Sequence, residues 1–210
     1  MKRKSRKTNI TYDEDHILNI VLMGNSGCGK TCLLDRMADD KFSENTFQTF
    51  PGDVPKEKEI NLDGSQFLLR IWDTPGSERY RSLLKPFQED IREFNFWQSG
   101  VILVYDVTNW QSSKDIDMWL EFLQEDAPED LNNFGSLVIF GNKIDLDLDW
   151  FRFERFDFPY FQVSAKSGKN VDPSLMYLAR EIQKIKTKTL KLVSFLFFYF
   201  FKKSYFHFSF

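Results

Sequence analysis

Apolar runs interrupted by polar residues and glycines divide the chain into alternating strands and helices. Three almost continuous aliphatic and β-branched runs are typical of buried parallel strands: Ile17–Met23, Gly100–Asp106 and Ser136–Asn142. Apolar residues at helical spacing predict three helices, one beginning at Lys30 and two covering Ser112–Gln124 and Asp172–Ile185. The alternation of strands with helices favours a parallel sheet.

Three further strands complete the predicted sheet. Lys56–Leu62 and Gln66–Trp72 flank Asp63-Gly64, a hairpin turn signal, and Phe161–Ser164 is a short last strand. The chain is therefore predicted to form an α/β fold, a doubly wound and mostly parallel six-stranded sheet with helices on both faces. Such sheets bind ligands beyond the carboxyl ends of their strands, where the motifs below are found.

A glycine-rich loop follows the first predicted strand and leads into a helix. It fits the phosphate-binding pattern G-x-x-x-x-G-K-[ST] without a mismatch, as Gly24-Asn25-Ser26-Gly27-Cys28-Gly29-Lys30-Thr31. Backbone N–H groups of such a loop surround the β-phosphate, Lys30 reaches the β/γ oxygens, and the Thr31 hydroxyl is placed for Mg²⁺. The segment from Asn25 through Cys32 is predicted to contact a nucleotide. The alternative, a chance glycine-rich turn, is disfavoured by the flanking strand and helix.

Two later motifs distinguish guanine from adenine. Asn142-Lys143-Ile144-Asp145 follows a buried strand, and the Asp145 carboxylate can accept hydrogen bonds from both N1–H and the exocyclic amine of guanine. Ser164-Ala165-Lys166 ends the last strand, where the Ala165 N–H can meet the guanine O6. Read alone, the first motif could be a polar turn between a strand and a helix. A P-loop kinase or ATPase would be the alternative if Asp145 did not read the base.

Asp73-Thr74-Pro75-Gly76 ends another predicted strand. Asp73 can hold Mg²⁺ through water, and the Gly76 amide can meet a γ-phosphate. This loop is therefore expected to sense whether that phosphate is present.

Composition limits the class of protein. The chain has 210 residues, 42% of them hydrophobic and 28% charged, as expected for one soluble globular domain. A formal net charge of −3 does not favour nucleic-acid binding. Cys28 and Cys32 are the only cysteines, and they indicate reduced thiols in a reducing compartment, so a cytoplasmic protein is expected.

The order of these motifs resembles the Ras superfamily of small GTPases, P-loop NTPases whose nucleotide-binding unit is called the G domain. Ile71-Trp72-Asp73-Thr74, Glu78-Arg79-Tyr80-Arg81 and Ile102–Asn109 resemble its Rab branch in particular, and the resemblance covers about residues 17–185. It implies GTP and GDP as ligands, Mg²⁺ as cofactor, and effector, exchange and activating proteins as partners. It further implies that Phe42 flanks the guanine and that Thr49 in switch I ligates Mg²⁺ when GTP is bound.

The sequence departs from the family pattern in switch II and before the last strand. Ser77 stands where the family has the glutamine that orients the attacking water, and serine is about two carbons shorter, so slow hydrolysis is expected. Lys30, Thr49, Gly76 and Ser77 are the predicted catalytic set. The alternative is a hydrolysis-deficient, GTP-bound interaction protein. Only residues 146–160 are left for the family's fourth helix, which is therefore expected to be short or absent.

The two ends differ from the predicted GTPase domain at residues 16–187. Residues 1–15 are expected to form a disordered basic arm, with contact to an anionic membrane as the alternative. Residues 188–210 lack a prenylation cysteine but contain an apolar run, Leu192–Phe201, flanked by Lys191 and Lys202. This tail could lie in a membrane interface, pack on the domain, or have no role.

Overall fold

A mixed six-stranded sheet forms the centre of the protein. The computed structural model describes residues 3–4, 11–44, 54–76, 99–125, 136–146 and 156–206, with residues 3–4, 125 and 190–206 as backbone alone. The strands lie in the order β4 (Lys56–Leu62), β5 (Ser65–Asp73), β3 (Ile17–Met23), β6 (Gly100–Asp106), β7 (Ser136–Asn142) and β8 (Tyr160–Gln162). Only the β4–β5 pair in this sheet is antiparallel. The predicted mostly parallel sheet is confirmed.

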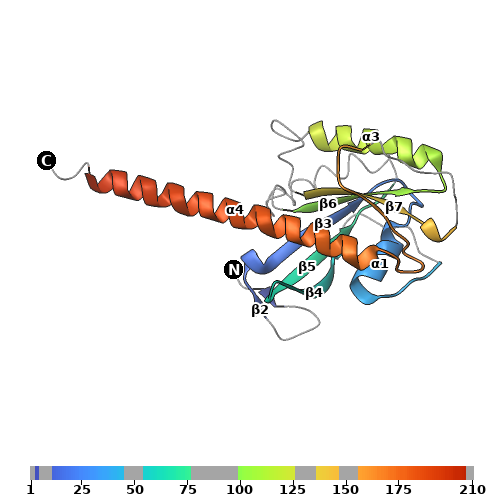
Figure 1. The fold of residues 1–210 in the computed structure, drawn as a ribbon, viewed down its shortest axis with the longest axis horizontal. Helices are drawn as coiled ribbons and strands as arrows, with labels where there is room; N and C mark the ends of the chain where they lie inside the picture. Colours follow the sequence, from blue (N-terminus) through green and yellow to red (C-terminus); the bar gives the residue numbers. More distant parts are fainter. Residues whose placement is uncertain are drawn as a thin grey trace.

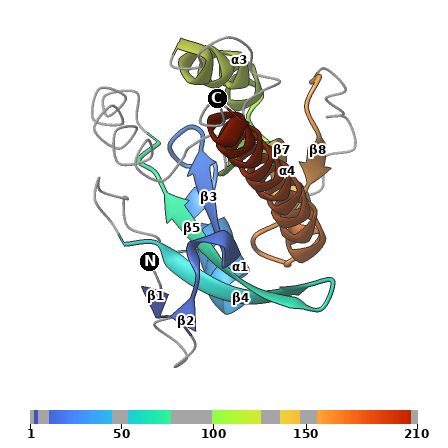
Figure 2. The ribbon, with the colours of Figure 1, turned by 90° about the vertical axis from the view of Figure 1, so that its left-hand side faces the viewer.

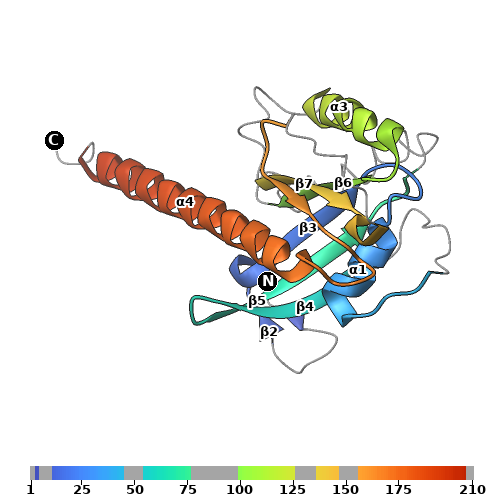
Figure 3. The same ribbon diagram turned by 45° about the vertical axis from the view of Figure 1, so that its right-hand side comes forward.

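Helices cover both faces of the sheet (Figures 1 and 3). Helix α1 (Lys30–Asp39) and helix α4 (Val171–Phe206) pack on one face, and α3 (Trp110–Glu125) packs on the other. Residues of β3 alternate between the two cores, with Leu18 and Ile20 on the α1/α4 side and Val21 on the α3 side. Burial on both faces accounts for the continuous apolar runs in the sequence.

Two element boundaries differ from prediction for local reasons. Helix α3 begins at Trp110, because the Asn109 side chain caps it, accepting from the N–H groups of Gln111 (3.0 Å) and Ser112 (3.3 Å). Strand β8 ends at Gln162, because the Ser164 N–H bonds in a turn to the Lys169 carbonyl at 3.0 Å. Between β7 and β8 the structure describes one 3₁₀ turn, Ile144–Leu146, and the expected position of a fourth helix falls mostly outside the described residues.

The described part of the N-terminal arm contains two short strands and a 3₁₀ turn. Arg3–Lys4 (β1) pairs with Thr11–Tyr12 (β2), and a 3₁₀ turn covers Glu14–His16. The Tyr12 side chain is buried against Ile17 and Leu68. Burial of the Tyr12 ring favours a fixed conformation of the segment that leads into β3.

Helix α4 is longer than its sequence pattern predicts. It runs without a break from Val171 to Phe206 and projects away from the sheet, as Figure 1 shows; Figure 2 views the molecule from the side to which it points. Pro173 lies in the first turn, where proline is tolerated, and no proline or glycine follows it within the helix. No helix among the described residues is long and apolar enough to cross a membrane.

Candidate functional site

The glycine-rich loop lies between β3 and α1, at the carboxyl end of the sheet. Lys30 is only 6% exposed, and its Nζ donates hydrogen bonds to the carbonyls of Gly24 and Asn25, both at 2.8 Å. The ammonium group is thus folded back over the loop rather than extended into solvent. Ser26 and Gly27 are exposed at the rim, and Gly29 precedes the first turn of α1. Exposed backbone and the N-terminus of a helix here favour an anion.

The end of β5 lies directly on this loop. Thr31 Oγ1 donates to Asp73 Oδ2 at 2.5 Å, so a hydroxyl and a carboxylate oxygen meet beside Lys30. A Cβ added to Gly76 would lie 2.4 Å from Lys30 Nζ and 2.5 Å from the Ser26 amide nitrogen. The segment that follows β5 therefore touches the loop without room for a side chain at Gly76.

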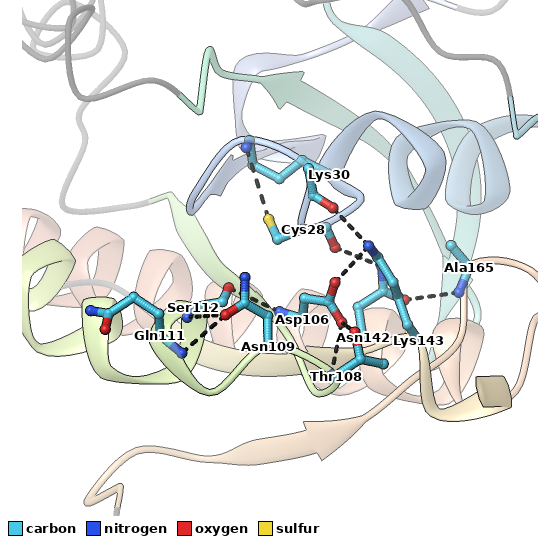
Figure 4. A network of polar contacts seen from close by, with 11 residues as sticks. Cys28, Lys30, Asp106, Thr108, Asn109, Gln111, Ser112, Asn142, Lys143 and Ala165 are labelled. Atoms are coloured by element: carbon cyan, nitrogen blue, oxygen red, sulfur yellow. Dashed lines mark hydrogen bonds and ion pairs between the residues drawn. The ribbon is translucent and has the colours of Figure 1, made fainter. Parts of the chain in front are cut away.

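Asn142 joins the glycine-rich loop to the loop after β8. Its Nδ2 donates to the Cys28 carbonyl and its Oδ1 accepts from the Ala165 N–H, both at 3.0 Å (Figure 4). The side chain is 1% exposed, and both of these contacts reach backbone atoms. The neighbouring Lys143 Nζ donates to the Gly27 carbonyl at 2.8 Å. Asn142 and Lys143 thus hold the glycine-rich loop in place, and Asn142 also ties it to the loop after β8.

Asp145 is exposed at the edge of this junction. Asp145 accepts a hydrogen bond from Ser164 Oγ at 2.5 Å. Ser164 Oγ in turn accepts a hydrogen bond from the Ser167 N–H at 3.0 Å. Serine therefore holds one carboxylate oxygen in place within an ordered turn.

The segment after α1 reaches the same region. Lys166 Nζ pairs with Glu44 at 2.9 Å, and this contact raises the pKa of Lys166. Phe42, two residues before Glu44, is half-buried against the core. Cys32 Sγ lies 3.6 Å from the Ser43 carbonyl. These contacts bring residues 42–44 beside the loop that follows β8.

Sequence reasoning missed two side chains that support the site. Asp106, at the end of β6, pairs with Lys143 at 2.6 Å and accepts hydrogen bonds from Thr108 Oγ1 and N–H at 2.7 and 2.9 Å (Figure 4). Arg36 on α1 donates to the carbonyls of Ala165 (2.8 Å) and Lys166 (2.9 Å). A carboxylate at a strand end was the available signal for Asp106. Nothing in the sequence pattern marks Arg36.

Cys28 faces inward from the loop. It is fully buried, and desolvation raises the pKa of its thiol, so the neutral form is favoured at neutral pH. Its Sγ lies 3.9 Å from Lys30 Nζ. Its contribution to the site is packing beneath the loop, with its carbonyl bound by Asn142.

The structure brings together the predicted site residues within its described part, from the ends of β3, β5, β7 and β8 and from the segment after α1. Thr49 and Ser77 lie outside the described residues. Comparison with known proteins then gives the family, since the model described as Ras family matches residues 19–184. The chain belongs to the Ras family.

Within this family the chain is Rab-like. It is 34% identical over 182 residues to Ras-related protein Rab-26 of Rattus norvegicus, an alignment covering 83% of this chain and 66% of that protein. Rab-26 of Bos taurus is 34% identical over 183 residues, covering 83% of this chain and 67% of the relative. This Ras-family chain thus spans about two thirds of the length of these relatives.

Proposed function

We propose that this Rab-like chain is a molecular switch that binds GTP and GDP with Mg²⁺ and hydrolyses GTP slowly. The observation that carries the proposal is the Asn142 bridge between the Cys28 carbonyl and the Ala165 N–H, at 3.0 Å on each side. It joins the glycine-rich loop to the loop after β8, whose Ser164 contacts the candidate base-reading carboxylate of Asp145, and so supports a nucleotide site that includes both loops. One purine nucleotide can span the two.

Asp145 carries the preference for guanine in this proposal. Its carboxylate accepts from N1–H and from the exocyclic amine, whereas adenine offers an acceptor at N1. The Ser164 hydroxyl, which donates to Asp145 at 2.5 Å, orients the carboxylate. The Ala165 N–H, which donates to Asn142 Oδ1 in this structure, would turn to the guanine O6, and Lys166 and Phe42 complete the base site as side walls.

The phosphate end fits Mg²⁺, because a hydroxyl and a carboxylate are oxygen donors of the kind that this ion prefers. Thr31 and Asp73 would hold it, together with Thr49 in the GTP form. The ion neutralises charge on the β- and γ-phosphates when it is bound. Lys30 leaves the Gly24 and Asn25 carbonyls to contact phosphate oxygens, and the Gly76 N–H meets the γ-phosphate. Asn25 through Cys32 line the phosphate path.

Identification of the nucleotide that copurifies with the protein tests this function directly. We expect GDP or GTP, and we expect GTP but not ATP to displace a fluorescent GDP analogue in the presence of Mg²⁺. An adenine nucleotide in the purified protein, or equal displacement by ATP, would contradict the base assignment and support the kinase or ATPase alternative.

Ser77→Gln is expected to raise intrinsic hydrolysis. A glutamine side chain reaches the attacking water that serine cannot, and a gain of about tenfold corresponds to roughly 1.4 kcal/mol of barrier. Single-turnover hydrolysis of bound GTP measures it, with Ser77→Ala as the control that shortens the side chain further. An unchanged rate would favour the alternative of a GTP-bound interaction protein without useful hydrolysis.

Partners are proposed to recognise the switch segments around Thr49 and after Gly76. The γ-phosphate contacts of these segments exist only with GTP, so effectors, exchange proteins and activating proteins can distinguish the two nucleotide states. Regulation of membrane traffic or signalling is the process that we propose for such a switch. No nucleic-acid partner is proposed.

The domain arrangement is a GTPase domain at residues 16–187 between an arm, 1–15, and a tail, 188–210. We place the protein in the cytoplasm, since its two cysteines are not joined in a disulfide, with peripheral membrane contact through the tail. The backbone of α4 continues through Leu192–Phe201, an apolar run of the sequence that is flanked by Lys191 and Lys202. Aromatic residues and lysines suit the boundary between headgroups and acyl chains.

Truncation after Thr189 is expected to abolish binding to anionic liposomes and to leave GTP affinity unchanged. Ten apolar residues in a helix rise about 15 Å, half the hydrocarbon thickness, so an interfacial position is the geometry expected. Liposome sedimentation compares the full chain with the truncated one. Equal sedimentation of both would remove the tail from the membrane contact, and lost GTP binding would show that the tail packs on the domain.

A further inference from the structure

The side chain of Asn25 in the glycine-rich loop is held between two residues of α3. Asn25 Nδ2 donates to Asp115 Oδ2 at 2.5 Å, and Trp119 Nε1 donates to Asn25 Oδ1 at 2.9 Å. We call these three residues the α3 clasp. One end of the amide acts as donor and the other as acceptor, so the two contacts fix its orientation as well as its position.

Both α3 residues of the clasp are themselves held in place. The Trp119 ring is 1% exposed and packs edge-on against Phe122, with ring centroids 6.2 Å apart. The second carboxylate oxygen of Asp115 accepts from Gln111 Nε2 at 2.8 Å. The clasp therefore ties the loop to a helix that is anchored on the opposite face of the sheet from α1.

The backbone of Asn25 connects the clasp to the phosphate end of the site. Its carbonyl accepts from Lys30 Nζ at 2.8 Å and from the Cys28 N–H at 3.4 Å. A shift of Asn25 would move the loop carbonyls that receive Lys30 and the N–H groups expected to face the phosphates. Asp115 and Trp119 can thus act on the phosphate site through one intermediate residue.

We propose that Asp115 and Trp119 are positioning residues that slow nucleotide release by holding Asn25. This inference rests on the proposed nucleotide site and assigns the α3 residues a role in it. The chemistry of the clasp makes it sensitive to a single atom, because an aspartate at position 25 would offer Asp115 a second carboxylate at hydrogen-bonding distance. Like charges at that distance repel, and the donor to Asp115 is lost.

The test compares GDP release from four full-length proteins: the unaltered chain, Asn25→Asp, Asp115→Asn and the double variant. Asn25→Asp is expected to accelerate release of a fluorescent GDP analogue about tenfold or more, since a partly buried polar contact becomes repulsive. Asp115→Asn should have a smaller effect, because two amides can still pair. The double variant restores a carboxylate–amide pair with its polarity reversed, and Trp119 can still donate, so release should return close to that of the unaltered chain.

Glu121→Gln is the matched control, since it removes one carboxylate from an exposed position of the same helix. It should leave release unchanged. Additive effects in the double variant, or release from Asn25→Asp equal to that of the unaltered chain, would overturn the proposal. Melting temperatures of all five proteins separate faster release from a general loss of stability, and rescue by the second substitution is specific to the pair.

Binding of GDP by the unaltered chain tests the proposed function independently. If that chain retained ADP instead, the guanine assignment would fail, and the same release rates measured with an ADP analogue would still test the clasp, which acts on the phosphates. A chain that bound neither nucleotide would overturn both.

Discussion

Asp145→Asn is expected to change the preferred base from guanine to xanthine. The carboxylate accepts two hydrogen bonds from guanine, whereas an amide has one acceptor and one donor and so matches N1–H and the C2 carbonyl of xanthine. Losing one charge-assisted hydrogen bond and opposing two donors should weaken GTP binding about 100-fold, or roughly 3 kcal/mol. Competition of GTP, XTP and ATP against a fluorescent nucleotide measures the change.

The control for this variant is Asp157→Asn, which removes the same charge from an exposed position before β8. It should retain the preference for GTP. The assignment of Asp145 would be wrong if its variant held GTP normally and still rejected XTP. The Ser164 hydroxyl can donate to an asparagine oxygen as well as to a carboxylate, so the ordered turn around position 145 is expected to survive the substitution.

Gly29→Ala is expected to weaken nucleotide binding at least as strongly. Gly29 has φ = 94°, and a Cβ there would lie 2.4 Å from Asn142 Nδ2. Asn142 cannot move aside without losing its bonds to the Cys28 carbonyl and the Ala165 N–H. The substitution therefore separates the glycine-rich loop from the loop after β8, and we expect a loss of about 100-fold or more in GDP affinity.

Gly27→Ala is the matched comparison. Gly27 also has a positive φ, 78°, but a Cβ at this position would meet nothing within 4 Å. Both variants pay the cost of a left-handed backbone, about 1–3 kcal/mol, and only Gly29→Ala adds the collision. Equal GDP affinities of the two variants by titration would show that backbone strain alone, and not the Asn142 junction, sets the effect.

The sequence predicted the parts of the site that depend on strand ends. Parallel strands bring their carboxyl ends to one edge, so Gly24, Asp73, Asn142 and Ser164 could be placed together from motif order alone. The contacts that brace the site are different. Asn25 meets Asp115 across 90 positions of the chain and Trp119 across 94. Such pairs depend on how α3 is rotated over the sheet, and Trp119 reads in the sequence as an ordinary core residue.

The ends of the chain were harder to predict because burial there depends on distant residues. Tyr12 lies in a polar, charged stretch, and its ordering follows from contacts with Ile17 and Leu68. The end of α4 was placed at the last residue of its apolar stripe, but helical backbone needs no buried face where proline and glycine are absent. The stripe marks where the helix packs, and not where it stops.

Helix α4 is joined to the domain close to its middle. Lys186 Nζ donates to the carbonyls of Glu14 (2.8 Å) and Ile17 (2.7 Å). Desolvation of its ammonium group by burial lowers the pKa of Lys186. The helix continues from Lys186 to Phe206, a rise of roughly 30 Å. A continuous helix acts as a spacer of fixed length. A surface that held the far end of α4 would therefore keep the nucleotide site at a set distance from that surface and at a set tilt to it.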